Sequence, residues 1–189
     1  MTQVAMEVSG FPEHRVFGSG TVLDSARLRY HLGQHLRVDS RSVHAFVIGE
    51  HGDSEIAAWS SANVSGVPLN SFCEMRGHFN HEGNTESIEE QVKNSAYEII
   101  EKKGATYYAI ALAVTRIARA IVREEHSVLP VSAYVNGHYG VSDVYFGVPS
   151  IVGAEGVEKV LDIPLDASEQ QQLEHSVQTL KDVITGLDL

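Results

Sequence analysis

The sequence predicts an α+β domain in which an antiparallel sheet packs against long helices. Strand-like apolar runs at residues 128–135, 144–152 and 157–161 follow one another and are separated by glycine-containing turns, as neighbouring antiparallel strands are. Residues 88–99 and 173–184 place apolar side chains every three or four positions, which is the repeat of an amphipathic helix. These two patterns together predict the fold class.

Length and composition are those of one ordinary globular domain. The chain has 189 residues, 43% of them hydrophobic and 21% charged. A net charge of −11 without a basic block argues against nucleic-acid binding, because phosphates require clustered Lys and Arg. The single cysteine, Cys73, excludes an intrachain disulfide, and neither a signal pattern nor a spanning apolar segment is evident. We therefore expect a cytoplasmic protein without a membrane partner.

The first twenty residues are predicted to form a short helix and a short strand. Residues 2–9 can be helical up to Gly10 and the Phe-Pro turn that follows. Residues 15–17 can form a strand before Gly18. Alone, such a strand would leave an exposed apolar edge that favours association.

Residues 21–36 form the next predicted helix, and the spacing of its charged residues bears on function. Asp24 and Arg27 are three residues apart and share one helix face. Arg29 follows Arg27 by two positions and points in a widely different direction. One helix can therefore serve two separate sites.

An apolar run at residues 43–48 predicts a buried strand that ends at a histidine flanked by glycines. Within residues 49–55, G-E-H-G-D-S-E, the glycines let a substrate or cofactor approach His51, whose imidazole exchanges a proton near neutral pH. These residues alone equally allow an incidental histidine in a polar loop. Residues 56–69 could form a hairpin, and residues 70–86 are polar and irregular in pattern, so we expect a loop or the start of a helix there.

The remaining segments are predicted to be helical around the three strands. Residues 87–103 form a helix that Gly104 interrupts. Residues 106–124 form a second helix, which is apolar on most faces and expected to be central and buried. Asp166 opens the last helix, with Glu169 three residues later as its capping box.

Two motifs give the chain a resemblance to a known family. G-S-G-T-V-L-D-S-A-R at residues 18–27 and G-E-H-G-D-S-E at residues 49–55 closely resemble the lactate dehydrogenase branch of the lactate/malate dehydrogenase family. The resemblance covers essentially the whole chain and corresponds to the C-terminal part of a family member, so the first half of the cofactor domain has no counterpart. It implies a family-like catalytic and substrate-binding domain at residues 21–189, preceded at residues 1–20 by a helix and strand remnant of the Rossmann domain.

This resemblance implies reduction of pyruvate to L-lactate with NADH. His51 is then the acid/base, and Asp24 accepts a hydrogen bond from its other ring nitrogen, which fixes the tautomer and favours the protonated ring. Arg27 binds the substrate carboxylate, because a planar guanidinium can donate two parallel hydrogen bonds and Lys cannot. The alternative for Arg27 is a surface pair with Asp24 or Asp53.

Two further roles follow from the same resemblance. Thr106 is expected to line the substrate pocket and Ser19 to lie near the nicotinamide of the NAD cofactor. Without the family, Thr106 is simply a helix N-cap. No metal site is expected, since His31 and His35 are four residues apart but no HExxH pattern or cysteine pair accompanies them.

Arg29 and His44 make a separate constellation. In bacterial members activated by fructose 1,6-bisphosphate, an Arg five residues after the aspartate and a His seven residues before the catalytic His bind phosphate across a subunit interface. Arg29 and His44 meet both offsets. We therefore expect an allosteric anion site shared by two subunits of an oligomer, usually a tetramer in this family. The alternative is a partly buried Arg and a core-facing strand His.

Other functions stay open because several family motifs have no counterpart in the sequence. These motifs are the phosphate loop, the acid for the adenosine ribose and the mobile loop that separates lactate from malate dehydrogenases. The chain could belong to a malate dehydrogenase, or be a truncated, catalytically incompetent module for oligomerisation and effector binding. We expect the isolated chain to give no turnover of pyruvate and NADH.

Overall fold

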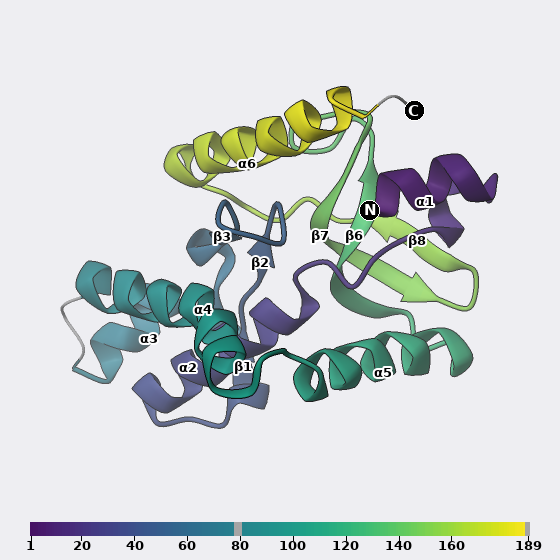
Figure 1. The fold of residues 1–189 in the computed structure, drawn as a ribbon. Coiled ribbons are helices and arrows are strands. Elements are labelled where there is room, and N and C mark those ends of the chain that lie inside the picture. The colour runs from purple at the N-terminus through teal and green to yellow at the C-terminus, as the bar shows by residue number, and fades with distance from the viewer. Residues whose placement is uncertain (78–80, 188–189) are drawn as a thin grey trace.

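The computed structural model describes residues 1–77 and 81–187, and helices cover a central antiparallel sheet on both sides (Figure 1). The helices are α1 (Thr2–Ser9), α2 (Val22–Leu36), α3 (Leu69–Met75), α4 (His81–Lys103), α5 (Tyr108–Val122) and α6 (Ala167–Thr185). The central sheet has the order β6-β7-β8, with β6 (Ser127–Val135), β7 (Val144–Gly153) and β8 (Gly156–Val160). The three predicted strands and the α+β class are confirmed.

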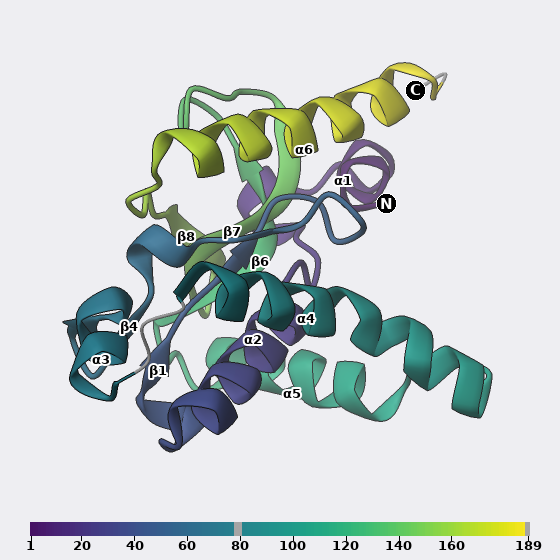
Figure 2. The same cartoon turned by 90° about the vertical axis from the view of Figure 1, so that its left-hand side faces the viewer.

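Strand β7 is the most deeply buried element of the sheet. It pairs antiparallel with β6 on one edge and with β8 on the other, and both α5 and α6 pack against it. Figure 2 shows α6 on one side of the sheet and α2, α4 and α5 on the opposite side. Because both faces are covered, the strand is apolar along nearly its whole length rather than alternating.

The predicted single strand at residues 43–48 is wrong. The segment forms two short strands in different sheets, β1 (Val43–His44) and β2 (Val47–Ile48). Strand β2 pairs with β3 (Ile56–Ala57), and β1 pairs with β4 (Asn63–Val64). The apolar run shows burial of the segment but not the change of partner at Ala45 and Phe46, because a pattern of hydrophobicity does not identify the pairing strand.

Part of the hairpin expected at residues 56–69 is present, near the end of that range. Strand β4 turns into β5 (Val67–Pro68) through Ser65 and Gly66, both of which have positive φ. Positive φ at both central residues is the requirement of a tight two-residue hairpin turn. In the segment at residues 70–86, which we expected to be a loop or the start of a helix, α4 begins at His81, and α3 is a further short helix that we did not expect; residues 78–80 fall outside the described chain.

The predicted strand at residues 15–17 is also wrong. Residues Glu13–Arg15 form a single 3-10 turn after Pro12, and only Gly18 bridges to the sheet, antiparallel to Ser132 of β6. Two further 3-10 turns lie at Ser40–Ser42 and Trp59–Ser61. The N-terminal segment therefore packs against the edge of the central sheet through a turn instead of adding a strand.

Helix α5 is amphipathic and not buried all round as expected. Its buried residues Ala113, Ile117 and Ala120 form one stripe at helical spacing, which faces the sheet. Leu112 and Val122 on the other face are exposed within this chain. The sequence could not distinguish an exposed apolar face from a buried one, because composition alone does not tell what covers a helix.

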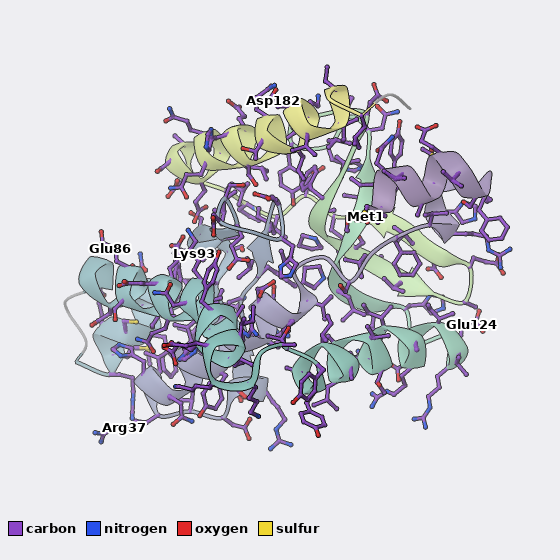
Figure 3. All side chains as sticks on the ribbon, in the orientation of Figure 1. Met1, Arg37, Glu86, Lys93, Glu124 and Asp182 are labelled. Carbon is purple, nitrogen blue, oxygen red and sulfur yellow. The ribbon has the colours of Figure 1, made fainter. Side chains whose placement is uncertain are left out.

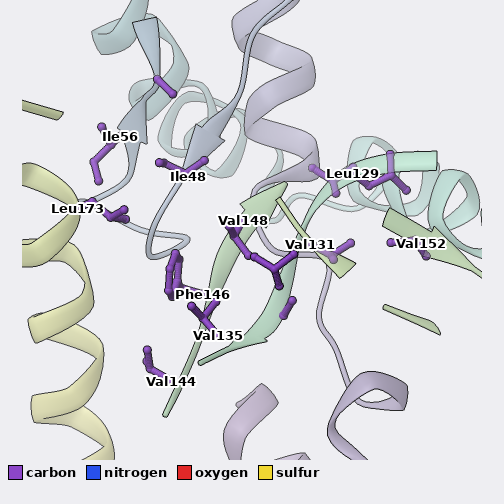
Figure 4. Close-up of a cluster of buried hydrophobic side chains, with 14 of the residues drawn as sticks. Ile48, Ile56, Leu129, Val131, Val135, Val144, Phe146, Val148, Val152 and Leu173 are labelled. Carbon is purple, nitrogen blue, oxygen red and sulfur yellow. The ribbon is translucent and has the colours of Figure 1, made fainter. Parts of the chain in front are cut away.

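Two clusters of buried side chains form the core. One lies between the central sheet, α5 and α6; it includes Phe146 and Val148 of β7 and Leu173 of α6 (Figure 4). The other lies between α2 and α4, where Leu28 and Val92 are buried. Helix α2 contributes Val22 to the first cluster and Leu28 to the second, so both clusters hold it in place.

Helix α6 begins with the predicted capping box. Glu169 N donates to Asp166 Oδ1 at 2.9 Å, and Asp166 N donates to Glu169 Oε2 at 3.0 Å. Leu173 and Val177 of the predicted stripe are buried. Within the described chain, no helix combines the length and apolar character needed to cross a bilayer.

Candidate active site

The loop between β2 and β3 carries His51 on a fixed backbone. Gly49 exchanges two backbone hydrogen bonds of 2.8 Å with Gly147 of β7. Gly49 has a φ of +92°, and a Cβ at this position would lie 2.6 Å from Ser176 Oγ on α6, so a side chain is excluded here. The side chain of His51 beyond it is 57% exposed. An accessible imidazole is thus held by two backbone anchors.

Asp24 pairs with this imidazole from the first turn of α2. The carboxylate is buried, and its Oδ2 lies 2.7 Å from Nδ1 of His51. The hydrogen bond to Asp24 raises the pKa of His51, and the partial burial of the ring opposes that shift without reversing it. The predicted contact is present. It leaves Nε2 as the ring nitrogen that can exchange a proton with a bound molecule.

Arg27 lies one turn further along α2 and contacts the same carboxylate. Its Nη1 is 3.1 Å from Oδ1 of Asp24, and its side chain is 12% exposed. Its Nη2 is buried and has no hydrogen-bond partner in the described chain. The pair with Asp24 that the sequence offered as an alternative therefore exists, but it uses only part of the guanidinium. The remaining donor is available for an anion.

Two hydroxyl groups fix this turn of α2 to the strand that precedes the histidine loop. Thr21 Oγ1 donates to the carbonyl of Val47 at 2.6 Å, and Ser25 Oγ accepts the N–H of Val47 at 2.8 Å. Both side chains are fully buried. Sequence reasoning missed these two residues, although each lies within the motif at residues 18–27. They set the distance between Asp24 and His51 by joining their elements directly.

Ser176 on α6 is a third supporting residue that the sequence did not indicate. Its buried hydroxyl accepts the N–H of Glu50 at 2.8 Å and lies 3.2 Å from Ser54 Oγ, which also donates to the Glu50 carboxylate. The residue is remote from the loop in sequence and lies beside Val177 of the apolar stripe. No local pattern links it to the loop.

Glu55 is a buried carboxyl next to the Asp24–His51 pair, and the sequence did not single it out either. One donor atom from each of Asp24, His51 and Glu55 lies within 4.8 Å of the other two. Burial, with the nearby Asp24 charge, raises the pKa of Glu55 to about 8. Asp24 contacts both His51 and the Arg27 cation, and within the described chain Glu55 lies next to this pair without a cation of its own.

A cavity of about 470 Å³ opens beside the exposed side of the histidine loop. Ser19 and His51 both line it, so the structure brings these two predicted residues to one cavity. Gly20 and Gly147 leave its wall without side chains, whereas Phe146 and Leu180 make another part of it apolar. The cavity therefore offers a flat, mostly apolar surface next to an imidazole.

Thr106 is not joined to this cluster by any interaction in the described chain. It is half-buried and precedes α5, whose N-cap is Tyr107 with no side-chain cap. The alternative interpretation of Thr106 as the N-cap is therefore wrong. Its predicted role in the substrate pocket stays a prediction.

Arg29 and His44 lie away from the Asp24–His51 pair. Arg29 is half-buried on α2, where burial and the neighbouring Arg116 charge lower its pKa. His44 is exposed on β1, so the core-facing alternative for it is wrong. Within the described chain, no hydrogen bond or ion pair joins these two side chains.

The chain is similar to a family of dehydrogenases over most of its length. A profile of the lactate/malate dehydrogenase alpha/beta C-terminal domain matches residues 21–187. An L-lactate dehydrogenase of Acetivibrio thermocellus is 52% identical over 189 residues, which are 100% of this chain and 60% of that protein. An L-lactate dehydrogenase of Thermoanaerobacterium saccharolyticum is 51% identical, with 100% of this chain and 61% of that protein covered.

Solved structures give the same relationship. The minor L-lactate dehydrogenase from Enterococcus mundtii, in its ligands-bound form, superposes with a TM-score of 0.95 at 45% identity and covers 100% of this chain and 60% of that chain. A lactate dehydrogenase from a Medee basin deep-sea metagenome library superposes with a TM-score of 0.94 at 41% identity, covering 97% of this chain and 59% of that chain. The chain thus spans about 60% of the length of these relatives.

Proposed function

The chain belongs to the lactate/malate dehydrogenase family as its alpha/beta C-terminal domain, and we propose that it is the catalytic and substrate-binding part of an NAD-dependent L-lactate dehydrogenase. The proposed reaction is the reduction of pyruvate by NADH to L-lactate. The observation that carries the proposal is the single buried carboxylate of Asp24, which contacts both His51 and Arg27. Reduction of a 2-oxo acid requires a proton donor and a carboxylate anchor, and His51 and Arg27 are these two groups.

His51 is the proposed proton donor. Its raised pKa favours the protonated ring, and the Asp24 contact at Nδ1 directs the opposite nitrogen, Nε2, outward. In the reduction, the N–H of Nε2 gives its proton to the carbonyl oxygen of pyruvate, which becomes the hydroxyl of lactate. In the reverse direction the neutral ring takes that proton back.

Arg27 is the proposed anchor of the substrate carboxylate. Its buried Nη2 lacks a partner in the described chain, and a substrate carboxylate would satisfy it with a charge-assisted hydrogen bond. Since Arg27 and His51 share Asp24, anchoring the carboxylate at Arg27 orients the neighbouring carbonyl toward the ring.

The cavity beside His51 fits one face of a nicotinamide. Its glycine-lined wall admits a flat ring, and Ser19 is the proposed contact to that ring. NADH supplies the hydride when it is bound there. Gly20 and Gly147 allow close approach, and Phe146 and Leu180 supply apolar contacts for the ring. Thr106 is proposed to line the substrate side of the pocket.

We divide the chain into residues 1–20, which belong to the dinucleotide-binding domain, and residues 21–189, which form the catalytic domain. The match of the family profile from residue 21 supports this boundary. The complete enzyme is proposed to be a cytoplasmic homotetramer.

Arg29 and His44 are the proposed binding site for fructose 1,6-bisphosphate, each supplied by a different subunit. The exposed position of His44 and the unpaired guanidinium of Arg29 in the described chain support an anion bound between copies. In the natural protein, Arg29→Gln should abolish activation by the bisphosphate and leave basal turnover unchanged. Activation that persists in this variant would overturn the assignment.

The main test is turnover of the natural protein that contains this sequence. We expect pyruvate-dependent loss of NADH absorbance, and His51→Asn should abolish it while NADH binding, measured by fluorescence, is kept. Faster turnover of oxaloacetate than of pyruvate would instead assign the chain to a malate dehydrogenase. The 189-residue chain alone should show no turnover, and loss of NADH with this chain would refute that expectation.

A further inference from the structure

Glu55 is a buried carboxyl for which the proposed mechanism has no use. It directly precedes β3 at the end of the histidine loop and is 6% exposed. No hydrogen bond to its side-chain oxygens is found among the residues that the structure describes. A carboxyl group without such partners is costly to bury, so its position next to the site requires an explanation.

Three helices and the histidine loop bring charged or titratable groups toward Glu55. Those groups are Asp24 and Arg27 from α2, Glu89 and Lys93 from α4, His175 from α6, and His51 from its own loop. Lys93 pairs with Glu89 at 3.2 Å and is seen on α4 in Figure 3. The cations at Lys93 and Arg27 thus have carboxylate partners of their own, Glu89 and Asp24, whereas the His51 ring gains a second acidic neighbour in Glu55.

The geometry couples the charge of Glu55 to that of His51. An imidazolium and a carboxylate at about 5 Å attract each other appreciably in a partly buried site, where the effective dielectric constant is about 20. The Glu55 charge accordingly raises the pKa of His51, and the His51 charge lowers the pKa of Glu55. The charge of each group therefore depends on the charge of the other as pH changes.

We propose that Glu55 is a positioning residue of the site, whose carboxylate holds the proton on His51 as pH rises and so extends reduction to more alkaline pH. This inference rests on the proposed function of His51 as the proton donor. Below the pKa of Glu55, about 8, the carboxyl is mostly neutral and His51 is held by Asp24 alone. Above that pH, the ionised Glu55 attracts the imidazolium and delays its deprotonation.

The test compares Glu55→Gln and Glu55→Asp in the natural protein. Gln keeps the size of the side chain and removes the charge, whereas Asp keeps the charge at a greater distance. Glu89→Gln is the matched control, because Glu89 lines the same small space but pairs with Lys93. Two profiles against pH are measured, kcat/KM for pyruvate and the rate at which diethyl pyrocarbonate modifies His51, read by peptide mass spectrometry.

Diethyl pyrocarbonate reacts with the neutral ring, so the pH midpoint of modification measures the protonation of His51 independently of turnover. In Glu55→Gln we expect both the midpoint and the alkaline limb of kcat/KM to move to lower pH by about half a unit or more, which is a ~3-fold loss of kcat/KM on that limb. Glu55→Asp keeps a charge, so both profiles should move less than in Glu55→Gln. Glu89→Gln should leave both profiles unchanged.

An unchanged His51 midpoint in Glu55→Gln, or an equal shift in Glu89→Gln, overturns the inference. A different result, the absence of pyruvate turnover by the unaltered natural protein, would overturn the proposed function itself. Far-UV circular dichroism and thermal unfolding monitor folding. Because Gln removes a buried ionisable group, Glu55→Gln should be at least as stable as the unaltered protein at alkaline pH.

Discussion

Replacing Arg27 by lysine separates the charge of the proposed carboxylate anchor from its geometry. In the structure Nη1 lies 3.1 Å from Asp24, and Nη2 is buried without a partner in the described chain. A lysine has one nitrogen, which cannot serve both Asp24 and a substrate in the same orientation. Loss of one or two charge-assisted hydrogen bonds of ~1.5–3 kcal/mol each, partly offset by the ammonium, leaves a net cost of about 2–4 kcal/mol.

At about 1.4 kcal/mol per tenfold, kcat/KM for pyruvate should fall ~30- to ~1000-fold in Arg27→Lys. Steady-state NADH oxidation over a range of pyruvate concentrations measures this, and much of the change should appear in KM. Arg37→Lys is the control, since Arg37 is exposed at the C-cap of the same helix, far from the site (Figure 3). A fall of less than about threefold in Arg27→Lys, or an equal fall in the control, would refute the role of the guanidinium.

Three other outcomes are expected. Because Asp24 raises the pKa of His51, the stability from their pairing is fully present below the ordinary histidine value of about 6.5 and is lost as pH rises through the folded-state pKa. Thermal unfolding should therefore show a deficit of His51→Asn in acid that shrinks toward alkaline pH, and a pH-independent deficit would contradict the pairing. Ser176→Ala leaves the N–H of Glu50 without its acceptor and should lower the free energy of unfolding by about 1–3 kcal/mol in urea titration, whereas an unchanged midpoint would mean that the loop does not depend on it. Asp166→Ala removes the carboxylate that accepts the N–H of Glu169 in the α6 capping box. It should lower the free energy of unfolding by ~1 kcal/mol in the same urea titration, whereas Asp166→Asn should largely preserve stability.

The sequence predicted best those features that depend on residues close together in the chain. Asp24 and Arg27 share a helix face because they are three residues apart, and the structure places both against one another. The capping box of α6 is likewise a local pattern. The contact between Asp24 and His51 joins two elements, and only the family resemblance connected them before the structure placed them 2.7 Å apart.

What the sequence missed depends on residues distant in the chain or on the choice of strand partner. Ser176 reaches the histidine loop across more than a hundred residues, so no periodicity could link it to Glu50. Glu55 carries no sign of burial, since a glutamate in a polar loop is normally solvated. The change of strand partner at Ala45 and Phe46 could not be seen either, because apart from His44 the residues on both sides of it are apolar.

The net charge of the chain would repel an anionic substrate, whereas the charge of its site would attract one. The chain carries −11 overall, which alone would repel the proposed substrate pyruvate, but surface charges are screened beyond about 8 Å at physiological ionic strength. Within the site, Asp24 is opposed by two cations, Arg27 and protonated His51, while Glu55 is mostly neutral at neutral pH. One positive charge is left over, and a bound carboxylate balances it. Attraction of the proposed substrate thus depends on the protonation of His51 and Glu55 rather than on the composition of the surface.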